Sequence, residues 1–267
     1  MSKLRRKIIM SQAMMTVVSQ TEIAKDIFEL RLKGALVNEM GAPDQFLHIR
    51  VPGDELLLRR PISIAAIDAD KEECVIIYRT EGKGTTIISK LTAGDELDIL
   101  GPLGNGYPID MLAAGQNALL IGGGIGVPPL YELAKQLHAK GVNIVSCFGF
   151  KNKEEVFYEE EFASFGKVNI ATDDGSYGKH GFVTQYFDEL DGFVPDAVFA
   201  CGPKGLLVAV SKTFDPSLTY LSLEERMACG IGACYGCVCD KKNSTSAYDN
   251  YRVCVEGPVF RAEEIVL

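Results

Sequence analysis

The stretch Cys229-Gly-Ile-Gly-Ala-Cys234-Tyr-Gly-Cys237 determines how the last part of the chain folds. Five of the eight cysteines of the chain fall in the short interval from Cys229 to Cys254. A disulfide framework would be spread over a small secreted chain, whereas a local cluster of cysteines indicates a metal site. The chain has three histidines, and none lies near this interval, which makes a mixed cysteine–histidine site improbable.

The spacing of these cysteines selects the kind of metal site. Four residues separate the first two cysteines, two separate the next two, and sixteen residues precede Cys254. This is the plant-type ferredoxin spacing, and the glycines let the backbone wrap closely with its N–H groups turned inward. The spacing therefore predicts a [2Fe–2S] cluster on Cys229, Cys234, Cys237 and Cys254. The alternative, a structural zinc site, usually has two short cysteine pairs. The additional Cys239 is interpreted as a small buried residue, although it could be a substitute ligand.

The composition limits the other possibilities. With 267 residues, of which 47% are hydrophobic, the chain is long enough for two or three domains. The net charge of −9 and the lack of a long basic run argue against a nucleic-acid partner. The basic start, residues 1–7, is followed by no clean signal-peptide core, and the longest apolar runs are too short to span a membrane. We expect a cytoplasmic protein with no membrane role.

Residues 1–113 have the pattern of a small antiparallel β-barrel. Short β-rich runs are separated by proline and glycine, and one helix is expected at 85–91. The expected strands are 14–20, 27–32, 46–51, 63–67, 75–79 and 96–100.

Residues 114–222 have a different pattern, in which apolar strands alternate with helices. This alternation predicts a parallel sheet covered on both faces. The expected strands are 118–121, 143–148, 168–171 and 197–201, and the expected helices are 128–140, 153–162 and 204–214. Residues 223–267 are rich in cysteine and turns and are expected to fold around the cluster as a third, plant-ferredoxin-like domain.

Three segments of the barrel carry residues suited to a flavin. Arg60-Pro-Ile-Ser63 offers a guanidinium for a pyrophosphate and a hydroxyl for a ring nitrogen, although alone it would indicate a structural salt bridge. Ile77-Tyr-Arg79 ends another strand, and a glycine turn at 82–84 leads into a helix, where anions bind readily. Together they could hold FAD. The candidate contacts are Arg60, Pro61, Ile62, Ser63, Ile77, Tyr78, Arg79, Gly84 and Thr85.

The middle segment carries candidate nicotinamide contacts. The glycine-rich turn 122–126 follows a strand and opens a helix, a context that suits a dinucleotide, although Val127 breaks the G-x-G-x-x-G fingerprint and a plain tight turn is the alternative. Asp174, after a later strand, could bond a ribose hydroxyl and would repel a 2′-phosphate, which favours NAD over NADP. The candidate contacts are Gly122, Gly123, Gly124, Gly126, Asp174, Cys201, Gly202 and Pro203.

Taken together, these motifs resemble the ferredoxin–NADP reductase superfamily. Ser222–Cys237, Cys254–Phe260, Leu58–Ser63, Gly101–Gly106 and Thr172–Gly178 are similar to the electron-transfer subunit of class 1B dihydroorotate dehydrogenase. The resemblance covers nearly the whole chain, except a few residues before Met10 and Cys239.

The resemblance implies FAD, a [2Fe–2S] cluster and NAD as substrate. It also implies an FMN-containing catalytic partner in a heterotetramer of two of each subunit. Electrons from dihydroorotate would pass through the cluster to FAD and on to NAD⁺ in pyrimidine biosynthesis, with Ser63 near the flavin N5 and Cys201 near the nicotinamide. The alternatives are a reductase subunit of another NAD(P)H-linked complex, of the sulfide dehydrogenase or transhydrogenase type, and a zinc-stabilised binding module.

Overall fold

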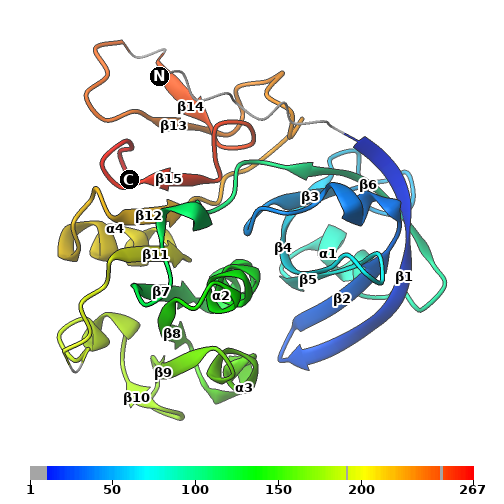
Figure 1. The fold of residues 1–267 in the computed structure, drawn as a ribbon. Coiled ribbons are helices and arrows are strands. Elements are labelled where there is room, and N and C mark those ends of the chain that lie inside the picture. Colours follow the sequence, from blue (N-terminus) through cyan, green and yellow to red (C-terminus); the bar gives the residue numbers. More distant parts are fainter. Residues whose placement is uncertain (1–10, 191, 247–248) are drawn as a thin grey trace.

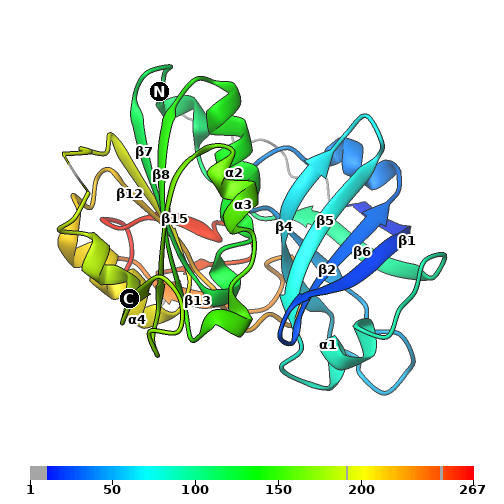
Figure 2. The same ribbon diagram turned by 90° about the horizontal axis from the view of Figure 1, so that it is seen from below.

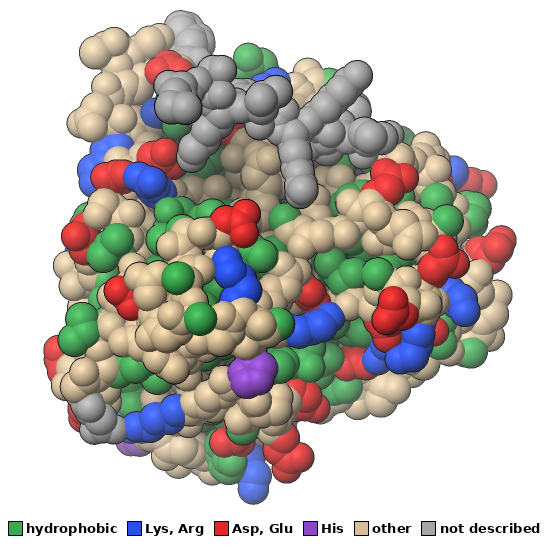
Figure 3. Space-filling view, in the orientation of Figure 1, with side chains coloured by type: hydrophobic (Ala, Val, Ile, Leu, Met, Phe, Trp, Pro, Cys, Tyr) green, Lys and Arg blue, Asp and Glu red, His purple; other side chains and the backbone are tan. Residues whose placement is uncertain are grey.

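The computed structural model describes residues 11–190, 192–246 and 249–267. The basic start of the chain and the unmapped residues before Met10 therefore lie outside the described residues. A barrel and an α/β sheet stand side by side, and the C-terminal segment crosses at one end of both (Figures 1 and 2). On the face shown in Figure 3, acidic and basic side chains are interspersed. In the described part of the chain, no helix is both long enough and apolar enough to cross a lipid bilayer.

The first part is a closed antiparallel barrel, as predicted, with strands in the order β1-β2-β5-β4-β3-β6. Its core consists of apolar side chains, such as Leu30, Leu47 and Ile76, that alternate along the strands with residues facing outward. The strands are β1 (Ser11–Ala24), β2 (Ile27–Lys33), β3 (Phe46–Ile49), β4 (Arg60–Asp68), β5 (Glu73–Arg79) and β6 (Glu96–Leu103), with η1 (Ala35–Glu39) after β2 and α1 (Lys83–Ile88) after β5.

The second part is a sheet in the order β10-β9-β8-β7-β11-β12-β15, parallel except for β15. Leu120 faces the cluster that includes α2, whereas Leu119 and Ile121 face the cluster that includes α4, so helices cover both faces (Figure 2). The strands are β7 (Asn117–Gly123), β8 (Asn143–Phe150), β9 (Gly166–Thr172), β10 (Lys179–His180), β11 (Ala197–Cys201), β12 (Thr219–Ser222) and β15 (Val259–Arg261). The helical segments are η2 (Ile109–Met111), η3 (Gly124–Gly126), α2 (Pro129–Ala139), η4 (Lys153–Glu155), α3 (Glu159–Ala163), η5 (Val183–Tyr186) and α4 (Lys204–Thr213).

One expected helix is broken. In place of a continuous helix over 153–162, the short turn η4 and the helix α3 are separated by Tyr158, which adopts a left-handed conformation with φ of 61°. This conformation cannot continue a right-handed helix. The Tyr158 hydroxyl donates a hydrogen bond to Glu29 of the barrel, so a contact with the other domain accompanies the break.

The C-terminal segment does not stay apart from the sheet. The strands β13 (Val238–Asp240) and β14 (Asn250–Arg252) pair antiparallel in a small two-stranded sheet. The chain then returns, and β15 pairs antiparallel with β12, with Leu221 opposite Phe260. The last strand of the segment 223–267 thus belongs to the sheet of the middle segment. A three-residue strand has no periodicity of its own from which the sequence could assign it.

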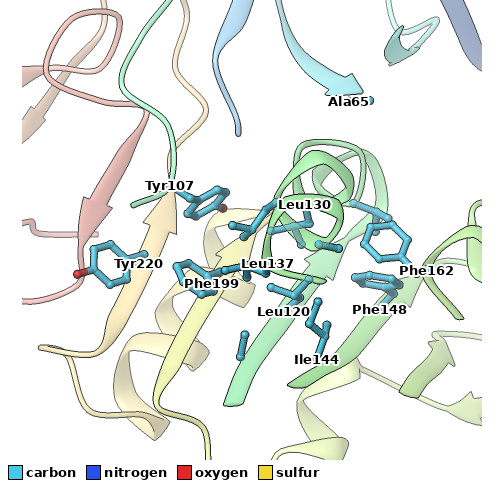
Figure 4. Packing of buried hydrophobic residues seen from close by; sticks show 14 of the residues in the cluster. Ala65, Tyr107, Leu120, Leu130, Leu137, Ile144, Phe148, Phe162, Phe199 and Tyr220 are labelled. Carbon is cyan, nitrogen blue, oxygen red and sulfur yellow. The ribbon is translucent and has the colours of Figure 1, made fainter. Parts of the chain in front are cut away.

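A buried carboxylate joins the barrel to the sheet domain. Glu132 on α2 accepts a hydrogen bond from the backbone N–H of Ile67 on β4 at 2.9 Å and another from Gln136 at 2.8 Å. Lys135 contacts the same carboxylate at 3.2 Å. Around this contact, aromatic and aliphatic side chains from α2 and the sheet pack toward Ala65 of the barrel (Figure 4). One hydrophobic cluster therefore runs from the sheet domain to the outer side of the barrel, next to the barrel's own core, and fixes the edges that form the site.

Candidate functional site

The candidate cluster loop brings Cys229 and Cys234 together. Their sulfur atoms lie 3.3 Å apart, and the backbone N–H groups of Ile231 and Cys234 point at the Cys229 sulfur at 3.5 and 3.4 Å. Burial opposes ionisation of this thiol, but the two N–H groups outweigh it and lower the pKa of Cys229 to about 6. A thiolate is the form that binds iron, so the loop is prepared for a metal centre.

The other two cysteines form a second pair. The N–H of Val253 donates to the carbonyl of Cys237 at 2.8 Å, beside the paired strands β13 and β14. Burial raises the pKa of Cys254 to about 12, and the adjacent Cys237 thiol raises it further, while the N–H of Gly232 opposes the shift. Cys237 and Cys254 are buried, whereas Cys229 and Cys234 are partly exposed. The loop therefore has an inner pair and an outer pair of sulfur ligands.

This arrangement fits a two-iron cluster better than a zinc ion. A [2Fe–2S] cluster needs two thiolates for each iron, which is the pairing observed. A single zinc ion needs its ligands around one point. Among the described residues, no group of three or more cysteine, histidine or acidic side chains is already placed to hold a metal ion, so the preference for the cluster rests on the spacing and pairing of the cysteines. Cys239 lies half-buried on β13, and burial raises its pKa to about 12.

The cluster loop rests directly on the barrel. Gly230 adopts φ of +69°, and a Cβ atom at this position would lie 2.5 Å from Nδ1 of His48 on β3. His48 is fully buried, so its ring has no free space to move into. Nearby, Arg59 donates to the carbonyl of His48 at 3.2 Å and to that of Asp98 at 2.9 Å. Glycine at 230 thus sets the distance between the cluster loop and the flavin-binding barrel.

The structure brings together Arg60 and Gly84, which belong to two of the predicted flavin motifs. A Cβ atom at Gly84 would lie 2.6 Å from Nε of Arg60, so only glycine lets α1 approach this guanidinium. The Thr85 hydroxyl accepts from the N–H of Gly82 at 3.3 Å and fixes the start of α1. The large apolar side chains of Leu57 and Leu58 are exposed immediately before Arg60. A cation beside uncovered apolar surface fits a ligand that has both phosphates and a planar ring.

The 77–79 motif is divided between two environments. The ring of Tyr78 is buried in the barrel core, and its hydroxyl donates to Gln20 at 2.7 Å, so only its backbone remains for a ligand. Arg79 points the other way and forms an ion pair with Glu155 at 2.7 Å. Its guanidinium also lies 3.6 Å from the position of a Cβ atom at Gly124. Arg79 therefore stands where the barrel meets the glycine turn of the second domain.

The glycine turn packs against the Cys201–Pro203 turn. Cys201 and Gly122 are partners in the register of β11 and β7, so both turns leave the same edge of the sheet. A Cβ atom at Gly126 would lie 2.4 Å from the carbonyl oxygen of Cys201, and one at Gly123 would lie 2.9 Å from Pro203. Close packing is thus a sufficient reason for glycine at positions 123 and 126. The same packing places Cys201 at the strand ends where ligands of such sheets bind.

Asp174 follows β9 at the same edge and is exposed. Its carboxylate accepts from the N–H and the hydroxyl of Ser176 at 2.9 and 2.6 Å, and these two bonds lower its pKa. The side chain is therefore an ordered anion facing solvent, as a ribose-binding residue would need to be.

Two buried polar residues were not anticipated from the sequence. Asp44 and His48 are each 0% exposed, and in the described part of the chain theirs are the buried side-chain polar atoms without a hydrogen-bond partner. Asp44 also has φ of 70°. A single aspartate after a proline indicates a turn, so nothing in the sequence marked it as buried.

Comparisons with known proteins agree with this geometry. Residues 14–107 match the oxidoreductase FAD-binding domain, and residues 224–266 match the iron–sulfur cluster binding domain of dihydroorotate dehydrogenase B. The electron transfer subunit of NAD⁺-dependent dihydroorotate dehydrogenase B from Enterococcus faecalis is 53% identical, with 96% of this chain and 98% of that protein covered. Its counterpart from a Geobacillus species is 55% identical, with 97% and 100% covered. This chain belongs to that family of electron transfer subunits.

Solved structures place this electron transfer subunit in the reductase fold. An NADH-dependent reduced ferredoxin–NADP oxidoreductase, described in a study of flavin-based electron bifurcation, has a TM-score of 0.83 and 29% identity, with 95% of this chain and 90% of that chain covered. An Amycolatopsis cytochrome P450 reductase shares the fold, with a TM-score of 0.68, 23% identity, and 81% and 71% of the two chains covered. The FAD-binding and iron–sulfur domains predicted from the sequence are confirmed.

Proposed function

We propose that the chain carries electrons from the catalytic subunit of a dihydroorotate dehydrogenase to NAD⁺, in the pyrimidine pathway and in the cytoplasm. One observation carries the proposal. Both cofactor domains occur in a single chain that aligns with 98% of an electron transfer subunit of this enzyme. Oxidation of dihydroorotate itself would take place on the partner, which would hold FMN and assemble with this chain as two of each subunit.

Different residues would bind the different cofactors. The four cysteines would hold a [2Fe–2S] cluster, while Arg60 and the α1 turn would hold the phosphates of FAD. The cluster supplies single-electron transfer, and the flavin exchanges single electrons on one side and hydride on the other. Ser63 would face the flavin N5, and Cys201 would lie against the nicotinamide. Asp174 would accept a ribose hydroxyl. The hydrophobic cluster that joins barrel and sheet keeps these groups at fixed separations, which hydride transfer requires.

The surface around the outer cysteine pair suits a partner subunit. Tyr235 is 72% exposed and Ile231 is 39% exposed, both within the loop that carries Cys229 and Cys234. Large apolar side chains in such positions are typical of interface anchors. A partner seated there would cover the loop and bring its own cofactor close to the cluster.

Purification under anaerobic conditions tests the proposal. We expect flavin, iron and sulfide in the purified chain, an FMN-containing protein that co-purifies with it, and NADH formation that depends on dihydroorotate in the complex. A colourless chain without iron would contradict the cofactor assignment. A coloured chain whose complex reduces NAD⁺ with a different donor would contradict the dihydroorotate assignment alone.

A second candidate function follows from the solved structure with a TM-score of 0.83. That protein is an NADH-dependent reduced ferredoxin–NADP oxidoreductase, and by this likeness the chain would serve as the reductase subunit of another NAD(P)H-linked complex. The identity of the co-purifying subunit distinguishes the two functions.

A further inference from the structure

The imidazole of His48 is buried between the barrel and the cluster loop without a hydrogen bond. The side chain is 0% exposed, and neither ring nitrogen has a hydrogen-bond partner among the described residues. Backbone carbonyl groups of Arg59 and Cys229 lie near the ring, but neither is in hydrogen-bonding geometry with it. An imidazole carries at least one N–H whether it is neutral or charged, and a buried N–H without an acceptor lowers stability. Such a group indicates an acceptor that is not an atom of the described chain.

The alternation of side chains along β3 turns this ring toward the cysteines. Leu47 points into the barrel core, so Phe46 and His48 point outward from the opposite face of the strand. Phe46 packs in the same hydrophobic cluster as Cys237 and Cys254, the inner pair of candidate ligands. The face of β3 that carries His48 is therefore the face turned toward the candidate metal centre.

The ring touches the ligand loop directly. A Cβ atom at Gly230, the residue after Cys229, would lie 2.5 Å from Nδ1 of His48. In the backbone, His48 is the partner of Pro61 in the register of β3 and β4, within the flavin segment Arg60–Ser63. His48 thus adjoins both the loop that carries the outer ligand pair and the strand that carries the flavin motif.

Sulfur atoms are the acceptors that a cluster would place beside this ring. The thiolates and sulfides of a [2Fe–2S] cluster are negatively charged, and uptake of one electron adds a further negative charge. An N–H that donates to one of these sulfurs stabilises the reduced form more than the oxidised form and so raises the reduction potential. The loop already uses donors of this kind, since the N–H groups of Ile231 and Cys234 point at the Cys229 sulfur.

Resting on the cluster of the proposed function, we infer that the ring N–H of His48 donates a hydrogen bond to a cluster sulfur and raises the reduction potential of the cluster. The ring keeps its oxidation state and its proton, because the electron enters the cluster and leaves it without residing on His48. The histidine thereby sets how readily the cluster takes an electron from the partner. Because His48 belongs to β3, the donor is fixed to the same barrel that would hold FAD.

Substitutions of matched shape separate the hydrogen bond from packing. His48→Leu fills the position without a donor, whereas His48→Asn and His48→Gln place an N–H near the positions of Nδ1 and Nε2. In the purified full chain with its cofactors, the cluster is titrated against redox potential and followed by its EPR signal. At the wild-type midpoint, His48→Leu should lower the ratio of reduced to oxidised cluster by about tenfold, and at least one amide variant should retain most of that ratio. His138→Leu, at an exposed histidine on α2, is the control and should leave the ratio unchanged.

Isotope labelling gives a readout that needs no substitution at position 48. In wild-type chain with ¹⁵N in its histidine rings, pulsed EPR of the reduced cluster should detect a coupled ¹⁵N nucleus, because an N–H···S bond carries spin density to the ring. His138→Leu should keep this coupling, and His48→Leu should abolish it. The wild-type spectrum decides the question even if His48→Leu binds no iron.

Several results would overturn the inference. If His48→Leu keeps the wild-type potential, or if neither amide variant differs from His48→Leu, the ring N–H does not act on the cluster. If the labelled wild type shows no ¹⁵N coupling, the ring donates elsewhere, for example to the carbonyl of Cys229. A wild-type chain without iron contradicts the cluster assignment and this inference together. A chain with iron whose complex does not oxidise dihydroorotate contradicts the proposed function alone, and the potentials and the coupling still decide the role of His48.

Discussion

Replacing Gly230 by alanine tests whether the cluster loop depends on its contact with the barrel. The new Cβ atom would lie 2.5 Å from Nδ1 and 3.0 Å from Cε1 of His48, and the backbone would have to keep φ of +69°. A left-handed alanine costs roughly 1–2 kcal/mol. Overpacking against a ring that cannot move costs roughly 1–3 kcal/mol more. The sum, roughly 2–5 kcal/mol, is enough to displace the loop that carries Cys229 and Cys234.

The assay measures iron and sulfide per chain together with the thermal midpoint. Gly115→Ala is the matched control, because Gly115 also has a positive φ, +83°, but its Cβ atom would have nothing within 4 Å. It should show the backbone cost alone and keep its cluster. Gly230→Ala should lose much of its iron and melt earlier than the control. Adding His48→Ala should restore part of the iron, since it removes the obstructing ring.

The result that would refute this reasoning is specific. If Gly230→Ala binds as much iron as Gly115→Ala and melts at the same temperature, the loop does not rest on β3 as described. If His48→Ala restores nothing in the double variant, the obstruction is not the imidazole.

Three further predictions concern other parts of the chain. Glu132→Ala should lower the free energy of unfolding by about 1–3 kcal/mol, because it leaves the partly buried N–H of Ile67 without an acceptor. Glu132→Gln should lower it by less, since the amide oxygen can still accept, and equal urea midpoints for the two variants would contradict this. Asp174→Ala should raise the kcat/KM for NADPH relative to that for NADH. If the ratio of the two values is unchanged, Asp174 does not determine which of the two nucleotides is used. The carboxyl of Asp44 has a pKa of about 7 in the folded chain against 3.8 unfolded, so the folded state holds the extra proton. The stability of the wild type relative to Asp44→Asn should therefore fall by roughly 4 kcal/mol as pH rises from 4 to 7 and then level off, and a parallel pH dependence of the two unfolding midpoints would contradict it.

Local patterns predicted much of the fold and of the site. The spacing of the four cysteines predicted the ligand loop, because the chemistry of the cluster sets that spacing within one short segment. Strand alternation predicted the barrel, and the Arg60 and Gly84 motifs proved to be in contact. These features depend on residues that are near in sequence or on strong periodicity.

Features that depend on distant contacts were not predictable. The break at Tyr158 accompanies a hydrogen bond to Glu29, which lies more than a hundred residues earlier. The burial of Asp44 results from packing of the barrel against strand ends near 201 and 222. The ring of Tyr78 points into the barrel because it lies on the inward face of β5, and the sequence of one strand does not reveal which of its two faces is inward.

The pairing of β15 with β12 has a consequence for how the protein is made. During synthesis, β12 leaves the ribosome with one edge unpaired, and its partner, residues 259–261, follows only after the cluster loop and Cys254 have been made. The sheet is therefore incomplete until residue 261 has been made, and by then all four cysteines have already been made. An exposed strand edge is open to wrong partners. The cysteines lie in the stretch of chain between the two paired strands, so a cluster held there and the closure of the sheet order the same segment.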